Sequence, residues 1–257
     1  AEIVRVLASG PNRPQTITFR EGLRNEEIGD ALQKEGIASE ADWDAALTSP
    51  RQATFLDSRP AGMSLLGYLL PATYAFDEKT TASGLLQSML DAFGKQVTPE
   101  IIAAGKNRGM TLHQVVTLAS IVEREAANAG ERPLIAAVFI NRLTQDTPLQ
   151  ADPTVQFVVS RVPGNADRFG YWKARLTDAD LALVSPYNTY LNRGLPPGPI
   201  ANPGIQSIRA VVSPAAVDYL YFVASPACDG THLFAATLAA HNENVAKFAA
   251  SSCAKGN

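Results

Sequence analysis

The sequence lacks the long apolar runs, the basic clusters and the leader that would mark several classes of protein. No stretch approaches the ~18 uninterrupted apolar residues of a membrane span. The first residues, Ala1 to Val6, have no signal-peptide features and no initiator methionine, so we expect a processed or truncated chain. The net charge is only -3 and no run of Lys or Arg stands out, so we expect no nucleic-acid partner.

Cysteine and histidine are scarce. The two cysteines, Cys228 and Cys253, lie near the C-terminus without the C-x-x-C spacing of a structural zinc site. The two cysteines either form a disulfide or remain as two free, buried thiols, and the sequence does not favour one of these alternatives. His113, His232 and His241 do not have metal-site spacing, and the chain has no nucleophile-elbow sequence. We therefore expect no metal and no cofactor.

The composition is that of a folded globular protein. Of the 257 residues, 46% are hydrophobic and 18% are charged, which suffices for a substantial core and for more than one domain. The chain begins with short apolar stretches at Ile3–Leu7 and Thr16–Phe19, which we predict to be strands. Helices are predicted at Asn25–Glu35 and from Ser39 onward. This order suggests a compact N-terminal module.

The clearest helix signal begins at Thr111. Thr111 followed by Gln114 forms a capping-box pattern, and Gly109 provides a break just before it. Apolar residues on both sides of the first turns predict a helix that is buried nearly all round. Further helices are predicted at 81–93, 99–107, 131–143, 155–159 and 203–211, with a strand at 219–224 and a final helix past His241 and Phe248.

Two acids lie in this apolar helix. At 100° per residue, Glu123 and Glu125 face opposite sides, so they cannot act as a pair. Desolvation holds a buried carboxyl in its neutral form, the state that a general acid needs. We prefer Glu123 as proton donor because its neighbours are small alanines, whereas Leu118 and Ile121 crowd Glu125. The alternative is that both acids pair with distant Arg or Lys side chains.

Two polar, proline-rich segments are predicted to carry function. The loop 148–154 holds Gln150, Asp152 and Thr154 around a proline, although an ordinary turn in which Asp152 caps a helix is the alternative. The segment 185–204 is long, rigid and aromatic, and such loops in globular domains tend to be functional.

In combination these motifs resemble the endolytic murein transglycosylases of the MltG, or YceG-like, family, which cleave peptidoglycan glycan strands. The matching stretches, in the family's order, are Leu65–Tyr74, Ala119–Glu125, Val138–Leu143, Leu149–Val155, Ser185–Tyr190, Gly194–Gly198, Ala201–Gly204 and Tyr219–Val223. Two usual acids of the family are replaced, by Leu66 and by Ala72, which leaves Glu123 as the acid matched to the catalytic position.

The resemblance implies an α+β fold. An N-terminal LysM-like βαα subdomain, residues 1–62, would bind glycan, and a mainly helical catalytic domain with a small β-sheet, residues 63–257, would follow. It also implies an extracytoplasmic enzyme, anchored in the cytoplasmic membrane by an N-terminal helix that is not in this chain. The implied partners are glycan strands and cell-wall synthases such as penicillin-binding proteins.

The implied reaction is lytic cleavage of the β-1,4 bond between MurNAc and GlcNAc, which leaves 1,6-anhydromuramoyl ends and terminates glycan elongation. Glu123 would protonate the leaving oxygen, while the substrate's N-acetyl group and 6-hydroxyl supply the rest. The residues expected to bind substrate are Tyr68, Tyr74, Gln150, Asp152, Thr154, Tyr187, Asn188, Thr189, Tyr190 and Asn202. The competing readings are a hydrolase that uses Asp152 as its base and a glycan-binding scaffold without catalysis.

Overall fold

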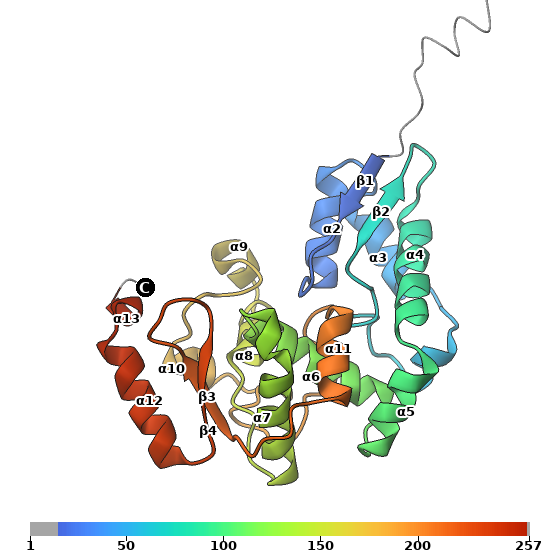
Figure 1. The fold of residues 1–257 in the computed structure, drawn as a ribbon. Helices are drawn as coiled ribbons and strands as arrows, with labels where there is room; N and C mark the ends of the chain where they lie inside the picture. The colour runs from blue at the N-terminus through green and yellow to red at the C-terminus, as the bar shows by residue number, and fades with distance from the viewer. Residues whose placement is uncertain (1–14, 256–257) are drawn as a thin grey trace, which may run out of the picture.

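The computed structural model describes residues 15–255 and has the predicted α+β composition. It is rich in helices and has two small antiparallel sheets. Figure 1 shows one sheet at each end of the molecule, with the helices α6, α7, α8 and α11 between them. No helix within residues 15–255 has the length and apolar character that crossing a membrane requires. The strand predicted at Ile3–Leu7 lies outside the described residues.

The N-terminal end is built on the pair β1 (Gln15–Thr18) and β2 (Thr73–Phe76). Their antiparallel register places Ile17 opposite Tyr74. The helices α2 (Asn25–Lys34), α3 (Glu40–Thr48) and α4 (Ala82–Gln96) lie beside this pair (Figure 1). The sequence did not predict β2, and its pairing with β1 extends this unit past residue 62, the boundary drawn from the sequence.

The middle of the molecule is helical, as predicted. Its elements are α5 (Pro99–Asn107), α6 (Leu112–Glu125), α7 (Arg132–Thr144), α8 (Asp152–Val159), the short α9 (Asn165–Phe169) and α10 (Asp178–Leu181), and α11 (Ile205–Val212). Every residue from Val115 to Val122 of α6 is buried. One hydrophobic core runs from Ile17 through α6 to Val212. This confirms the prediction that α6 is buried nearly all round.

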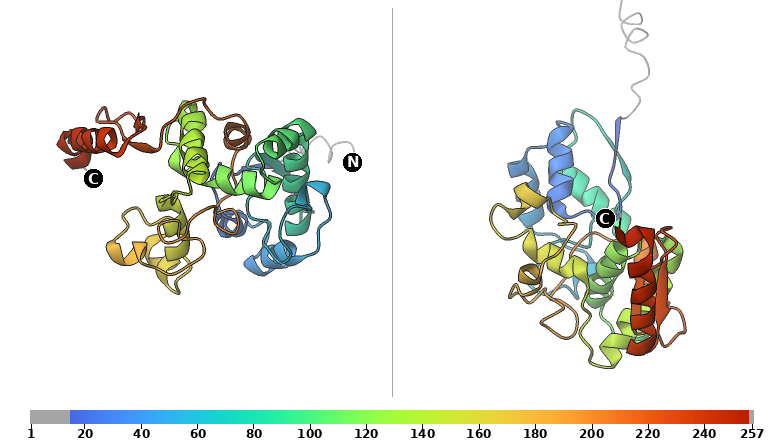
Figure 2. Two further views of the ribbon diagram at one scale, coloured as in Figure 1. Left: turned by 90° about the horizontal axis from the view of Figure 1, so that it is seen from below. Right: turned by 90° about the vertical axis from the view of Figure 1, so that its left-hand side faces the viewer.

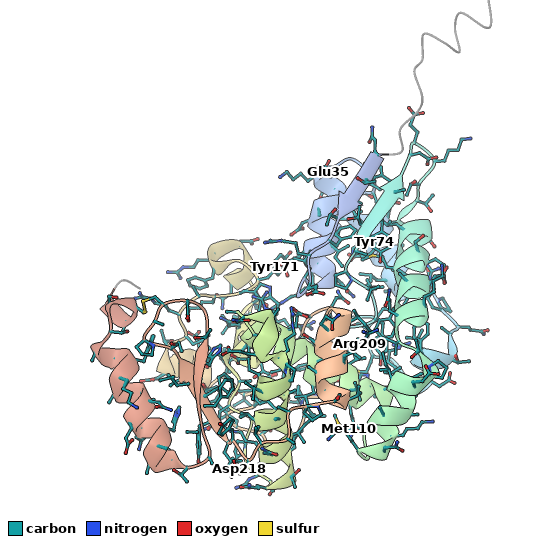
Figure 3. The ribbon with its side chains drawn as sticks, in the orientation of Figure 1. Glu35, Tyr74, Met110, Tyr171, Arg209 and Asp218 are labelled. Atoms are coloured by element: carbon teal, nitrogen blue, oxygen red, sulfur yellow. A yellow bond between two sulfur atoms is a disulfide. The ribbon has the colours of Figure 1, made fainter. Side chains whose placement is uncertain are left out.

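An aromatic clamp joins α2 to the middle of the chain. The indole of Trp172 lies between two guanidinium groups, with the carbon of Arg24 at 4.1 Å and that of Arg124 at 3.9 Å from the ring centroid. Its Nε1–H donates to Glu27. Tyr171, labelled in Figure 3 between α9 and α2, donates its hydroxyl to Asp30 at 3.0 Å. Cation–π and hydrogen-bond contacts therefore hold the N-terminal unit in place.

The C-terminal end contains β3 (Tyr221–Ala224), β4 (His232–Ala235), α12 (Leu238–Ala250) and α13 (Ser252–Lys255). The sequence predicted β3 and α12, but not β4. Figure 2 shows this unit at the side of the molecule opposite the N-terminal helices. His232 anchors it, because its ring Nδ1 lies 2.8 Å from an oxygen of Glu131 and its backbone N–H donates to the same carboxylate.

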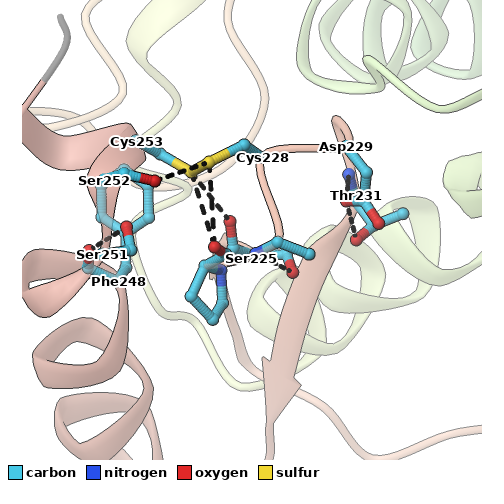
Figure 4. Close-up of a disulfide and its surroundings, with 10 residues drawn as sticks. Ser225, Cys228, Asp229, Thr231, Phe248, Ser251, Ser252 and Cys253 are labelled. Atoms are coloured by element: carbon cyan, nitrogen blue, oxygen red, sulfur yellow. Dashed lines mark hydrogen bonds between the residues drawn. A yellow bond between two sulfur atoms is a disulfide. The ribbon is translucent and has the colours of Figure 1, made fainter.

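A disulfide between Cys228 and Cys253 closes the C-terminal unit (Figure 4). The two Cα atoms are 5.6 Å apart and 25 residues separate them in the chain. The bond joins the β3–β4 connection to α13. Of the two readings that the sequence left open, the structure shows the disulfide.

Replacing both cysteines with serine is expected to lower the free energy of unfolding of this unit by about 3 kcal/mol, because the open chain gains conformational freedom when it unfolds. Calorimetry measures the effect as a lower Tm. Ser252→Ala is the matched control, since it removes a neighbouring hydroxyl and leaves the bond intact. An unchanged Tm in the double serine variant would contradict a stabilising role.

Candidate active site

Helix α6 brings both candidate acids to its last turn. The capping box predicted at its start is present, with Thr111 accepting from the N–H of Gln114 and Gln114 accepting from the N–H of Thr111. The helix ends at Glu125. Glu123 and Glu125 then face different surroundings, as the helical periodicity predicts.

Glu123 is a buried carboxylate whose two oxygens both have partners within the protein. Oε1 accepts from Arg132 at 2.9 Å, and Oε2 accepts from the backbone N–H of Gly204 at 2.9 Å and the hydroxyl of Ser207 at 2.8 Å. Only 5% of its side chain is exposed. The acid that we preferred from the sequence is therefore tied to α7 and α11 by charge-assisted hydrogen bonds.

A second acid shares the same arginine. Arg132 also contacts Glu21 at 3.0 Å. Burial raises the pKa of Glu21, the charge of Glu123 raises it further, and Arg132 lowers it. A Cβ atom on Gly204 would overlap the Glu21 carboxylate, so this position has room only for glycine while Glu21 stays in place. Glu21, Glu123 and Arg132 thus form a compact ionic cluster that joins three parts of the chain.

Glu125 has a different environment, because it lines an open cavity of about 330 Å³. The pKa of Glu125 is raised to about 8, first because burial disfavours the charged carboxylate and then because the charge of Asp152 lies nearby; Arg124 lowers it in part. The carboxyl is therefore protonated at neutral pH. The cavity is lined by Glu125, Phe139, Arg142, Leu149, Gln150, Asp152, Tyr190, Phe222 and His241.

Two loops form the polar wall of the Glu125 cavity. Asp152 accepts a hydrogen bond of 2.5 Å from the hydroxyl of Tyr190. The N–H of Gln150 donates to the carbonyl of Thr189, and the N–H of Ala151 donates to its hydroxyl. Gln150 has a φ of 49°, a value that is uncommon outside glycine. Strained backbone conformations of this kind occur mostly at functional sites.

Arg142 of α7 joins two walls of the cavity. Its Nε–H donates to the carbonyl of Leu220 at 2.6 Å, and its Nη1 donates to the carbonyls of Pro148 and Leu149 at 3.1 and 3.0 Å. Leu220 precedes β3, whereas Pro148 and Leu149 lead into Gln150. A single guanidinium therefore fixes the loop that carries Gln150 against the C-terminal unit.

Of the ten residues expected to bind substrate, only Gln150, Asp152 and Tyr190 line the Glu125 cavity. Six others are buried, with their polar atoms bonded within the protein: Tyr68, Tyr74, Thr154, Asn188, Thr189 and Asn202. Tyr187 is half-buried against Phe157. We therefore revise the role of the six buried side chains from sugar contact to support of the loops and the core.

Asn202 is the clearest of these supporting residues. Its side-chain oxygen accepts from the N–H groups of Gly67 and Leu69, and its amide donates to the carbonyl of Leu23 and to the side chain of Asn25. The side chain thereby joins the segment before β2 to the segment before α2, inside the protein.

We expect Asn202→Ala to lower the free energy of unfolding by about 2–4 kcal/mol, because it strands several buried polar groups. The KM of the folded variant should stay near the wild-type value. Chemical denaturation and kinetics separate the two effects, with the exposed Asn107→Ala as control. A raised KM at unchanged stability would restore Asn202 as a substrate contact.

The sequence reasoning missed five residues that line the cavity: Phe139, Arg142, Leu149, Phe222 and His241. Phe139 and Arg142 lie in the stretch Val138–Leu143 that carried part of the family resemblance, and Phe222 lies in Tyr219–Val223. These family stretches could therefore have identified the residues as candidates for the site. Within residues 15–255, no three His, Cys, Asp or Glu side chains gather in a way that could hold a metal ion.

Comparison with curated proteins finds three relatives, all named endolytic murein transglycosylase. The one from Bacillus subtilis (strain 168) is 40% identical over 188 residues, which cover 73% of this chain and 49% of that protein. The one from Streptococcus pneumoniae serotype 2 is 34% identical over 234 residues, or 89% of this chain and 40% of that protein. The chain thus spans about half the length of these relatives or less.

The fold is also shared with a solved structure. The crystal structure of a YceG-like protein from Listeria monocytogenes is 32% identical and aligns with a TM-score of 0.75, over 94% of this chain and 79% of that one. The sequence model of the YceG-like family matches residues 1–247. Sequence and fold therefore agree that this chain belongs to the YceG-like family.

Proposed function

We propose that the chain is the catalytic part of an endolytic peptidoglycan lytic transglycosylase that cleaves the β-1,4 bond between MurNAc and GlcNAc. The observation that carries the proposal is the position of the Glu125 carboxyl, whose pKa is raised by burial, in an open cavity with polar and apolar walls. Such a cavity suits a sugar, which has both apolar ring faces and hydroxyl groups. The names of the relatives support the same substrate and reaction.

Glu125, rather than Glu123, is the general acid of this proposal. A general acid needs a proton near neutral pH and access to the leaving oxygen. Glu125 meets both needs, since its pKa is raised to about 8 and it lines the cavity. Glu123 lacks the access, because its oxygens accept hydrogen bonds from Arg132, Gly204 and Ser207 and its side chain is buried. The order of preference drawn from the sequence is therefore reversed.

The lytic reaction then needs only one carboxyl group on the protein. Glu125 gives its proton to the glycosidic oxygen as the bond from C1 of the muramoyl sugar to that oxygen breaks, and the acetamido group of the same sugar stabilises C1. The 6-hydroxyl of that sugar attacks C1 and returns its proton to the Glu125 carboxylate. The product is a 1,6-anhydromuramoyl end, and no water is consumed. On nascent strands, this cleavage would end glycan elongation.

A peptidoglycan hydrolase with Asp152 as its base is the second candidate. Asp152 lines the same cavity and its charge acts on Glu125, so it is close enough to serve a bound water. The hydrogen bond from Tyr190 occupies one of its oxygens and favours a role in holding the loop. Loss of the two usual family acids, at Leu66 and Ala72, keeps a catalytically inactive scaffold as a third possibility.

Mass spectrometry of the products from purified sacculi and from nascent glycan separates the three functions. The proposal predicts anhydromuramoyl ends. Reducing ends would indicate a hydrolase with Asp152 as its base. A protein that pellets with sacculi and releases no fragment would be a scaffold. The protein is tested both free in solution and tethered to lipid vesicles, so that a requirement for a membrane surface is not mistaken for lack of activity.

We further propose that the N-terminal unit is LysM-like and holds the glycan. The support is its pair of antiparallel strands, β1 and β2, with α2 and α3 between them in the chain. An extracytoplasmic site of action at the membrane, beside cell-wall synthases, follows from the substrate. The disulfide agrees with an oxidising compartment. Pelleting of the folded protein with sacculi should weaken when exposed side chains of α2 and α3 are replaced, as in Lys34→Ala.

A further inference from the structure

The C-terminal unit supplies two side chains to the Glu125 cavity, Phe222 from β3 and His241 from α12. Figure 1 shows α12 beside β3, and the two elements are in contact. The ring of His241 stacks on that of Tyr221, with centroids 5.1 Å apart and planes at 22°. The imidazole is therefore held in a fixed orientation at the cavity wall.

The protonation of this imidazole follows from its surroundings. Burial lowers the pKa of His241 and the charge of Arg142 lowers it further, so the ring is neutral at neutral pH and carries one N–H. Nδ1 is enclosed and has no hydrogen-bond partner within residues 15–255. Because an enclosed N–H without an acceptor is costly, the proton belongs on Nε2.

Nε2 is the ring nitrogen left for a ligand. It is not among the enclosed atoms that lack partners, and it forms no hydrogen bond with the described residues. Its N–H is a donor, and the hydroxyl and acetamido oxygens of a glycan are acceptors that it can reach only from within the cavity. We propose that His241 is a substrate-binding residue, whose Nε2–H donates to a hydroxyl or acetamido oxygen of the glycan held beside Glu125.

This inference rests on the proposed function, and kinetics on peptide-free glycan strands test it. Glutamine can place an amide N–H near the position of Nε2, whereas the amide of asparagine is too short to do so. We expect His241→Ala and His241→Asn to raise KM by roughly threefold to tenfold with little change in kcat, as loss of one neutral hydrogen bond predicts. His241→Gln should retain a KM close to that of the wild type.

Two controls separate binding from folding. The three variants should have the same Tm, and Glu243→Ala, an exposed change on the same helix, should behave as the wild type. A wild-type KM in His241→Ala, or the same rise in KM in all three variants, would overturn the role of Nε2. A drop in kcat alone would also overturn it, because a binding contact acts through KM.

A direct measurement distinguishes failure of this inference from failure of the proposed function. The imidazole ¹⁵N signals of the wild-type protein are recorded while peptide-free glycan strands are added. If the protein does not cleave glycan but the Nε2 signal of His241 shifts, then the contact stands and the transglycosylase assignment fails. If glycan is cleaved without such a shift, the contact fails alone. If glycan is neither cleaved nor bound, both fail.

Discussion

Glu125→Gln is expected to reduce kcat by roughly 100- to 10,000-fold, the usual contribution of a general acid. Glutamine has nearly the same shape as the protonated carboxyl but cannot release a proton to the leaving oxygen. KM should change little, because the lost proton acts in the transition state and the side chain still fills its place beside Asp152. Initial rates of fragment release from labelled glycan measure the effect.

This loss should not come from unfolding. The folded protein raises the pKa of Glu125 from 4.5 to about 8, so its contribution to stability is fully present below pH 4.5 and is lost as the pH rises through 8. Above pH 8 the wild type holds a buried negative charge that glutamine lacks. The Tm of Glu125→Gln at pH 9 should therefore equal or exceed that of the wild type. A variant that is inactive and less stable at this pH would undermine the assignment.

The pH dependence of kcat/KM should report the titration of Glu125. In the free enzyme the acid must be protonated, so kcat/KM should be flat up to the pKa of Glu125, about 8, and should fall tenfold per pH unit above it. Asp152→Asn should move this fall to lower pH, because it removes a negative charge that raises the pKa. Asp146→Asn, at a highly exposed position, is the matched control and should leave the profile unchanged.

A fall in kcat/KM that stays at the same pH in Asp152→Asn would mean that another group controls the alkaline limb. Tyr190 is the neighbouring titratable group to test, since its hydroxyl contacts Asp152, although burial raises its pKa further above the usual 10.0 and away from pH 8. Tyr190→Phe removes its titration. The proposed acid requires that the fall near pH 8 persists in this variant.

Local sequence patterns predicted the helices well, because their signals lie within the helices themselves. The capping box at Thr111 and the glycine before it define the start of α6 with no help from tertiary contacts. The strands β2 and β4 were missed. Each has four residues and depends on pairing with a partner strand, so little in the local sequence marks it.

The choice between the two acids could not be made from periodicity. The helical wheel correctly placed Glu123 and Glu125 on different faces, but it could not show what lies opposite each face. The partners of Glu123 come from far along the chain: Arg132 is nine residues away, Gly204 81 and Ser207 84. Of the small alanines that suggested a cleft near Glu123, Ala119 is buried in the core, and Ala126 and Ala127 lie beyond the end of α6.

Tertiary contacts also decide which of the expected binding residues line the cavity and which are buried in the framework. In the stretches shared with the family, polar and aromatic residues occur both in the substrate site and in the framework that supports it, so residue type does not tell the two apart. Asn188 illustrates the framework, since it is buried and its amide donates to the carbonyls of Leu181 and Leu183. Only burial and contacts distinguish such a residue from Tyr190, which reaches the cavity.

The most direct test compares Glu123→Gln and Glu125→Gln on the same glycan, with anhydromuramoyl ends counted by mass spectrometry. The cavity at Glu125 predicts that Glu123→Gln, which weakens the ionic cluster with Arg132, loses stability but still produces these ends while folded. Glu125→Gln should remain folded and produce none. Abundant anhydromuramoyl ends from Glu125→Gln, together with their loss in a folded Glu123→Gln, would contradict the account.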